Sequence, residues 1–304
     1  GGGAAVSPSP AFRCSDGARE RGDTMVGTAP PARRWFLVEQ NGDWGRSAWE
    51  GLDCYDRAKE ELRSRLESAG ARLMLIRRPG ARPEPGHPTR RFCLVDTGRP
   101  RPLLWGTAHS DGDLVRAVES FGTWPDAEAT VPQAGEPGIV MVCTHGLKDV
   151  CCAIRGRPVA AALAEEWPEA VWECTHTGGD RFAANVTFLP DGTMYGRVDG
   201  SSAPDLALDH LDGLADLTRW RGRSLWHPAV QAAAADVLAT LEAPRWRDVV
   251  VARVTAQGPD TWQVELDVDG RTHRRTVTRS WAPRRRLTCA DTTEKTVAVW
   301  TAAR

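Results

Sequence analysis

The chain has 304 residues, of which 41% are hydrophobic and 26% are charged, and its formal net charge is −1. This composition predicts a globular protein of two domains, or of two domains and a small appendage. The near-neutral charge excludes a bulk attraction to nucleic acid or membrane surfaces, and no apolar run reaches the roughly 20 residues of a membrane-spanning helix.

The eight cysteines are too sparse for a secreted disulfide scaffold, and they are bunched rather than spread along the chain. The first residues lack a basic stretch followed by an apolar core, so we expect no signal peptide. We therefore expect a cytoplasmic protein without a membrane segment, whose clustered cysteines form a metal or thiol site.

Residues 1–32 are rich in Gly, Ala, Pro and Ser and predict a flexible N-terminal arm. From Trp35 onward, apolar residues recur at strand and helix spacing and define a domain over 33–124. Its predicted strands are 35–39, 72–76, 92–95 and 103–105, its predicted helices are 55–69 and 111–121, and a loop is predicted over 80–89.

A linker over 122–137 precedes a second domain, 138–218, in which the same order of elements returns. Its predicted strands are 139–143, 171–174, 186–189 and 194–198, and its predicted helices are 153–167 and 203–214. Both halves therefore read strand, helix, three strands, helix. The predicted fold class is α/β, with two thioredoxin-like layers in an order that a duplication would produce.

Residues 219–304 form a third, basic segment with 15 Lys and Arg against 9 Asp and Glu. A helix is predicted over 228–241 and strands over 249–254, 263–268 and 272–278. We expect this C-terminal appendage to be a small helix packed with an antiparallel meander.

Metal-ligand residue types gather in the second half. Cys143 ends a predicted strand, Cys152 opens the next helix, and His176 follows the next strand. Strand ends and helix starts face one crevice in an open α/β sheet, and a turn of helix would bring Asp180 to the same side as His176. Thiolates and imidazoles grouped in this way are typical of zinc and iron–sulfur centres.

The residues Cys-x-His-x3-Asp-x2-Cys, followed by His-x-Gly-Gly-x-x-Phe-Ala-x-Asn, resemble the sucrase/ferredoxin-like family of thioredoxin-like [2Fe-2S] ferredoxins, most clearly over 138–200. The resemblance implies that Cys143, Cys152 and His176 hold a [2Fe-2S] cluster. The family's second histidine, at His-x3-His spacing, is Asp180 in this chain. The family resemblance also implies single-electron transfer with a partner protein, such as a flavin reductase, rather than substrate chemistry.

The fourth ligand stays open, because a carboxylate is a harder ligand for iron than a thiolate or an imidazole. Cys151, Cys174 or Cys289 could take the place of Asp180, or the cluster could be absent, and His145 could orient a ligand or cap its loop. The remaining cysteines are isolated in the sequence, and we expect them to lie in the core or on the surface without a chemical role: Cys14, Cys54 and Cys93.

Three alternatives remain. Cys143, Cys152, Cys174 and His176 could bind zinc as a Cys3His set, although their spacing matches no common zinc finger. A thiol oxidoreductase would suit a thioredoxin-like fold, but the first strand–helix junction lacks Cys-x-x-Cys. Nucleic-acid binding is a third, because arginine and tryptophan interleave at 219–221, 245–247 and 281–286.

Overall fold

The computed structural model describes residues 11–82 and 89–304, so most of the loop expected over 80–89 and part of the N-terminal arm lie outside the described residues. The elements of the first half are α1 (Cys14–Glu20), β1 (Arg34–Glu39), α2 (Ala48–Gly51), α3 (Asp56–Ala69), β2 (Ala71–Arg77), β3 (Arg90–Asp96), β4 (Leu103–Ala108) and α4 (Asp111–Thr123).

The second half and the C-terminal segment contain the predicted elements in the predicted order, and the structure adds two short 3-10 helices and two strands, β9 and β13. The second half holds β5 (Ile139–Cys143), α5 (Val150–Glu166), β6 (Val171–Cys174), η1 (Asp180–Phe182), β7 (Val186–Leu189), β8 (Thr193–Tyr195), α6 (Ala203–Leu211) and β9 (Trp220–Arg223). The C-terminal segment holds α7 (Pro228–Leu238), η2 (Trp246–Asp248), β10 (Val250–Gly258), β11 (Thr261–Val268), β12 (Arg271–Trp281) and β13 (Ala298–Ala303).

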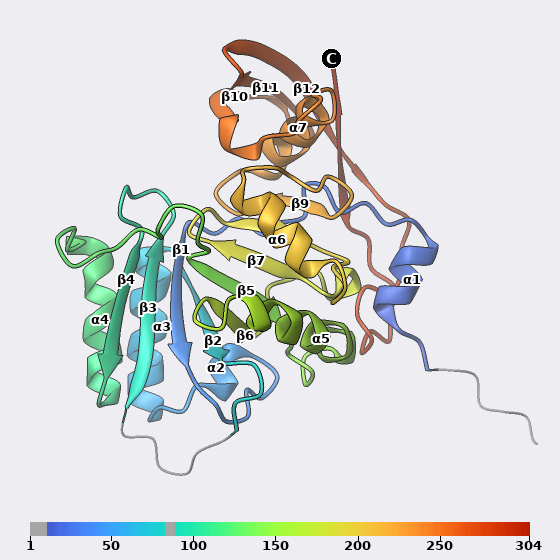
Figure 1. The fold of residues 1–304 in the computed structure, drawn as a ribbon. Helices are drawn as coiled ribbons and strands as arrows, with labels where there is room; N and C mark the ends of the chain where they lie inside the picture. Colours follow the sequence, from blue (N-terminus) through green and yellow to red (C-terminus); the bar gives the residue numbers. More distant parts are fainter. Residues whose placement is uncertain (1–10, 83–88) are drawn as a thin grey trace, which may run out of the picture.

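The strands form a nine-stranded mixed sheet in the order β4-β3-β1-β2-β6-β5-β7-β8-β9 and a four-stranded antiparallel sheet, β10-β11-β12-β13 (Figure 1). The predicted α/β class with a C-terminal helix and meander is confirmed. The halves also share their pairing senses: β1 pairs parallel with β2 and antiparallel with β3, as β5 does with β6 and β7.

The two halves join edge to edge into one continuous sheet. Strands β2 and β6 pair antiparallel, with Ile76 opposite Cys174 and Arg77 opposite Glu173. Because β2 and β6 occupy equivalent places in their halves, this pairing relates the halves by an approximate twofold axis. The pairing also brings the end of β2 beside the strand that leads into the His176 turn.

Side chains on one face of this sheet form a hydrophobic core, because the sheet curls and covers that face with its own strands. Trp105 on β4 and Trp172 on β6 are separated by three strands in the sheet order, yet their rings stack at 5.9 Å. A strongly twisted sheet bends in this way, so that its buried face partly wraps around itself. Cys143, Cys152 and Cys174 lie in this core.

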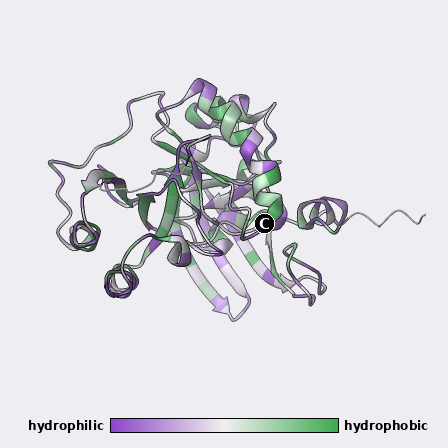
Figure 2. Ribbon diagram, turned by 90° about the horizontal axis from the view of Figure 1, so that it is seen from below, coloured by the Kyte–Doolittle hydropathy of each residue, from purple (hydrophilic) through white to green (hydrophobic). Residues whose placement is uncertain are grey.

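The opposite face is covered by helices. Leu62 and Leu66 of α3 and Leu114 of α4 pack on the first half of the sheet, and Val159 and Leu163 of α5 pack on the second. Figure 2 views the molecule from below, with apolar stretches in the strands at its centre. Among the described residues, no helix combines the length and the apolarity that crossing a membrane requires.

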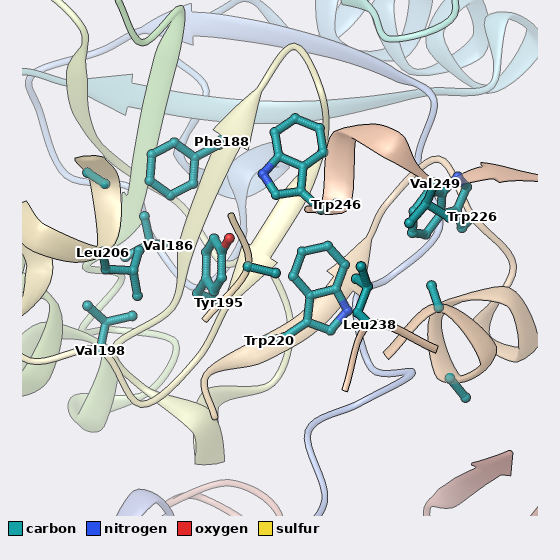
Figure 3. Packing of buried hydrophobic residues seen from close by; sticks show 14 of the residues in the cluster. Val186, Phe188, Tyr195, Val198, Leu206, Trp220, Trp226, Leu238, Trp246 and Val249 are labelled. Carbon is teal, nitrogen blue, oxygen red and sulfur yellow. The ribbon is translucent and has the colours of Figure 1, made fainter. Parts of the chain in front are cut away.

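The C-terminal segment shares a hydrophobic core with the second half. Trp220 on β9 packs edge-on against Tyr195 on β8 at 5.9 Å, and Trp246 joins the same cluster (Figure 3). Leu266 of β11 and Val277 of β12 are also buried in this cluster. Two of the tryptophans that suggested nucleic-acid stacking, Trp220 and Trp246, are therefore core residues.

The structure adds elements that the sequence patterns did not indicate. Strand β9 is only four residues long and pairs with β8, which places Trp220 and Arg221 in the large sheet rather than with the C-terminal meander. Its Gly222 has φ of 134°, so the strand lacks a regular alternation of side chains. Helix α5 begins at Val150, three residues earlier than predicted, because the Asp149 carboxylate caps it.

Residues 11–32 contact the rest of the molecule extensively. Helix α1 lies within the predicted N-terminal arm, and its Cys14 and Ala18 are fully buried. Cys14 is a core residue, as expected, but it lies among other cysteines rather than alone. The proposed domain boundaries themselves stay predictions.

Helix α5 and strand β5 are in such close contact that a side chain at Gly156 cannot be accommodated without movement. A Cβ atom there would lie 2.2 Å from the carbonyl oxygen of Cys143. We expect Gly156→Ala to lower the free energy of unfolding by about 1–3 kcal/mol, although alanine favours a helix, because backbone must shift. Urea denaturation measures this change.

The control is Gly122→Ala near the end of α4, where a Cβ atom would meet open space. This change should raise the free energy of unfolding by up to about 1 kcal/mol. Equal stabilisation by both substitutions would show that the α5–β5 contact adapts without cost.

Candidate functional site

The predicted ligands meet at the carboxyl ends of β5 and β6. Cys143 is the last residue of β5, and its register partner on the parallel strand β6 is Cys174, the last residue there. The start of α5 lies over these strand ends and brings Cys152 to them. Parallel strands present their ends at one edge of a sheet, which is where open α/β folds place binding sites.

Contacts link the four predicted ligands into one group. The Cys152 Sγ lies 3.2 Å from Asp180 Oδ1, and the His176 Nδ1 lies 2.7 Å from the same oxygen. The Cys143 side chain lies near those of Cys152 and His176, which both shift the pKa of its thiol. The structure therefore brings Cys143, Cys152, His176 and Asp180 together.

The turn between His176 and Asp180 depends on two glycines. Gly178 and Gly179 have φ of 98° and 79°, in the left-handed region that side chains disfavour. A Cβ atom at Gly179 would also lie 2.6 Å from an Arg221 nitrogen. The turn folds the chain back, so that Asp180 lies beside His176 at the start of η1.

The ionisation of the group is shifted by these contacts. Hydrogen bonding from Cys152 and His176 lowers the pKa of Cys143 well below that of a free thiol, although burial opposes this. The shared proton and burial raise the pKa of Cys152. Burial alone would lower the pKa of His176, but Asp180 and Cys143 raise it to about 9. The site thus stabilises one thiolate.

His145 does not face this group as a ligand. Its Nδ1 accepts the backbone N–H of His176 at 3.2 Å, and its Nε2 donates to the carbonyl oxygen of Gly45 at 2.8 Å. Burial lowers the pKa of His145, in keeping with a neutral ring that donates at one nitrogen and accepts at the other. His145 therefore positions the backbone of His176.

Arg221 supports the glycine turn from below, a role that the sequence patterns did not indicate. It is 1% exposed, and its Nη1 donates to the Gly178 carbonyl oxygen at 2.8 Å and to Asn185 Oδ1 at 2.9 Å. The Asn185 Nδ2 donates to the Gly179 carbonyl oxygen at 2.9 Å. The sequence does mark Asn185, a partner of Arg221, because it is the last residue of the Phe-Ala-x-Asn motif. In the sequence, Arg221 is visible only as part of the basic, tryptophan-containing segment 219–221.

The other candidate cysteines make no hydrogen bond with the four predicted ligands. Cys174 is fully buried beside Cys143, and burial raises its pKa well above that of a free thiol. Cys151 and Cys289 contact each other, and with Cys14 and Asp149 they form a separate group. The ligand atoms of that group all lie within 4.8 Å of one another, close enough to hold a metal.

The model of the family named "Sucrase/ferredoxin-like" matches residues 25–222, and the chain belongs to this family. The match includes Cys143, Cys152, His176 and Asp180, whereas Cys14 and Cys289 lie outside it. No curated protein and no solved structure matches the chain.

Replacing His145 should affect stability rather than metal content. His145→Ala leaves the Gly45 carbonyl and the His176 N–H without their partner, which costs about 1–3 kcal/mol of the free energy of unfolding. The metal-to-protein ratio should stay that of the unaltered chain, because both nitrogens are engaged elsewhere. Denaturant unfolding and elemental analysis measure the two quantities.

The exposed His109 provides the control, since His109→Ala should change stability by less than about 0.5 kcal/mol. Loss of metal from His145→Ala with unchanged stability would instead identify His145 as a ligand.

Proposed function

We propose that this protein binds a [2Fe-2S] cluster through Cys143, Cys152, His176 and Asp180 and exchanges single electrons with a partner protein. The observation that supports this proposal best is the meeting of these four side chains, from β5, α5 and the glycine turn, within the region that matches the family.

The donor set suits an iron–sulfur centre. Two thiolates and an imidazole are ligands that such centres use, and the carboxylate is the harder, less common fourth. The buried His176 Nδ1 also has no partner with hydrogen-bond geometry among the described residues, although it lies 2.7 Å from Asp180 Oδ1. A ring nitrogen and a carboxylate oxygen that lie this close together fit two ligands of one metal.

In this proposal, three of the ligands are buried and one is partly exposed. The bound cluster would supply a one-electron couple. Cys143, Cys152 and Asp180 hold their ligand atoms away from water, since all three are buried. The His176 side chain is 30% exposed, so it would provide the path between the buried site and a partner.

A cavity of about 470 Å³ borders His176 on its outer side. Its lining includes the cationic side chains of Arg46, Arg72 and Lys148, against one acidic side chain, Glu67. The Arg72 Nη2 also donates to the His176 carbonyl oxygen at 2.6 Å. Opposite charges steer association, so an acidic surface, as on a flavin reductase of suitable charge, is the proposed partner face.

The compartment proposed for this function is the reducing cytoplasm. All eight cysteines are free in the structure, although Cys151 and Cys289 lie with their sulfur atoms 3.4 Å apart. Thiols at this separation persist where reductants are abundant.

Iron and acid-labile sulfide analysis tests the cluster. Protein purified without oxygen should contain about two irons and two sulfides per chain and absorb visible light. Cys143→Ser and Cys152→Ser should each lose most of the iron, because each removes a thiolate ligand. Cys54→Ser, which changes a half-buried thiol in the first half, should keep it. Zinc without sulfide, or full iron in both ligand variants, would refute the assignment.

The fourth ligand is tested by the reduction potential. Asp180→His replaces an anionic ligand by a neutral imidazole, makes the centre less negative, and should raise the potential while iron content is retained. Redox titration followed by visible absorption measures the shift. Retained iron with an unchanged potential would show that Asp180 is not a ligand.

A further inference from the structure

A second group of ligand-type side chains lies next to the proposed cluster site but faces away from it. Cys14 comes from α1, Asp149 and Cys151 come from the start of α5, and Cys289 comes from the loop between β12 and β13. The first three are buried and Cys289 is half-buried. Figure 1 shows α1 beside this C-terminal loop, on the side of α5.

The spacing of the ligand atoms is that of a single tetrahedral ion. The Cys14 Sγ lies 3.4 Å from Asp149 Oδ2, the Sγ atoms of Cys151 and Cys289 lie 3.4 Å apart, and no pair exceeds 4.8 Å. Zinc bonds of about 2.3 Å to sulfur and about 2.0 Å to oxygen separate tetrahedral ligands by roughly 3.5–3.8 Å. A binuclear cluster divides its ligands between two irons and would need wider spacing.

We propose that Cys14, Asp149, Cys151 and Cys289 form a closed, four-coordinate structural zinc site. Three thiolates and one carboxylate suit zinc, whereas magnesium and calcium require oxygen ligands. All four coordination positions are filled by protein, which is typical of a structural ion rather than a catalytic one.

Hydrogen bonds around the group hold the ligands in place. The backbone N–H of Cys14 donates to Cys289 Sγ at 3.4 Å, and the Ser15 hydroxyl donates to Cys151 Sγ at 3.3 Å. The N–H groups of Cys151 and Cys289 donate to the two oxygens of Asp149 at 2.9 and 2.7 Å. Such donors orient metal ligands and offset the charge of thiolates.

The ion would connect α1 and the loop between β12 and β13 to the start of α5, which lies within the matched residues 25–222. Cys14 and Cys289 are 275 residues apart in sequence, and both lie outside the matched residues 25–222. A metal that joins distant segments stabilises the folded chain, because an unfolded chain cannot present the site. It would also anchor the start of α5, where Cys152 follows Cys151.

Zinc content in matched variants tests the proposal. The unaltered protein and Cys54→Ser should contain about one zinc per chain, whereas Cys14→Ser and Cys289→Ser should fall below about a tenth of this and keep their iron. Cys143→Ser should show the reverse, with iron lost and zinc kept. Because the two metals are counted separately, zinc without iron would sink the cluster and leave the zinc site standing.

A second measurement covers the case in which the serine variants fail to fold. Cys143→Ser protein is stripped of metal by a chelator and titrated with Co²⁺ alone. A thiolate-to-cobalt charge-transfer band should saturate at one ion per chain, and proteolysis within 282–297 should slow as Zn²⁺ or Co²⁺ binds, since the ion holds this loop.

Three results would overturn the zinc site. One is full zinc content in both Cys14→Ser and Cys289→Ser. Another is a stripped protein that gives no thiolate–cobalt band and whose peptide map contains a Cys151–Cys289 disulfide even after purification without oxygen. Such a result would show that these two cysteines form a disulfide rather than a metal site. The third is loss of iron instead of zinc from Cys289→Ser, which would place the iron–sulfur cluster at this second group.

Discussion

Helix α5 rests on the end of strand β5 with no room for a side chain between them, and both groups of ligand residues depend on that contact. The space for a Cβ atom at Gly156 is taken by the carbonyl oxygen of Cys143. Successive residues of an α-helix point about 100° apart. With the helix held in this place, Cys152 points to Cys143 and Asp180, whereas Cys151 points to Cys14 and Cys289.

Arg221 makes the opposite side of the proposed cluster site rigid. Burial lowers its pKa to about 9, which still leaves the guanidinium charged at neutral pH. A buried charge without partners would be costly, and Arg221 meets this cost with hydrogen bonds to Thr28, Gly178 and Asn185. The same bonds connect β9, the glycine turn and the segment before β1, all of which lie within the matched residues 25–222.

The two halves repeat one topology but differ in their chemistry. In the second half the strand ends carry Cys143 and Cys174, whereas the equivalent ends of β1 and β2 carry Glu39 and Arg77. The first half instead contributes the wall of the cavity beside His176, through Arg46 and Arg72. The half without ligands thus completes the surface next to the proposed site.

The order of most helices and strands, the α/β class and the ligand types at Cys143, Cys152, His176 and Asp180 follow from local patterns. Apolar periodicity and short motifs report on neighbours in the chain, and these four residues lie within two such motifs. Strand β9 and the task of Arg221 were missed, because a four-residue strand carries little periodicity and the burial of an arginine depends on distant partners. The second ligand group shows the same limit. In the sequence, Cys14 looks isolated, and Cys151 and Cys289 look like possible replacements for Asp180 as the fourth cluster ligand. Only the packing of α1 and the C-terminal loop against α5 brings their sulfur atoms within bonding range of one ion.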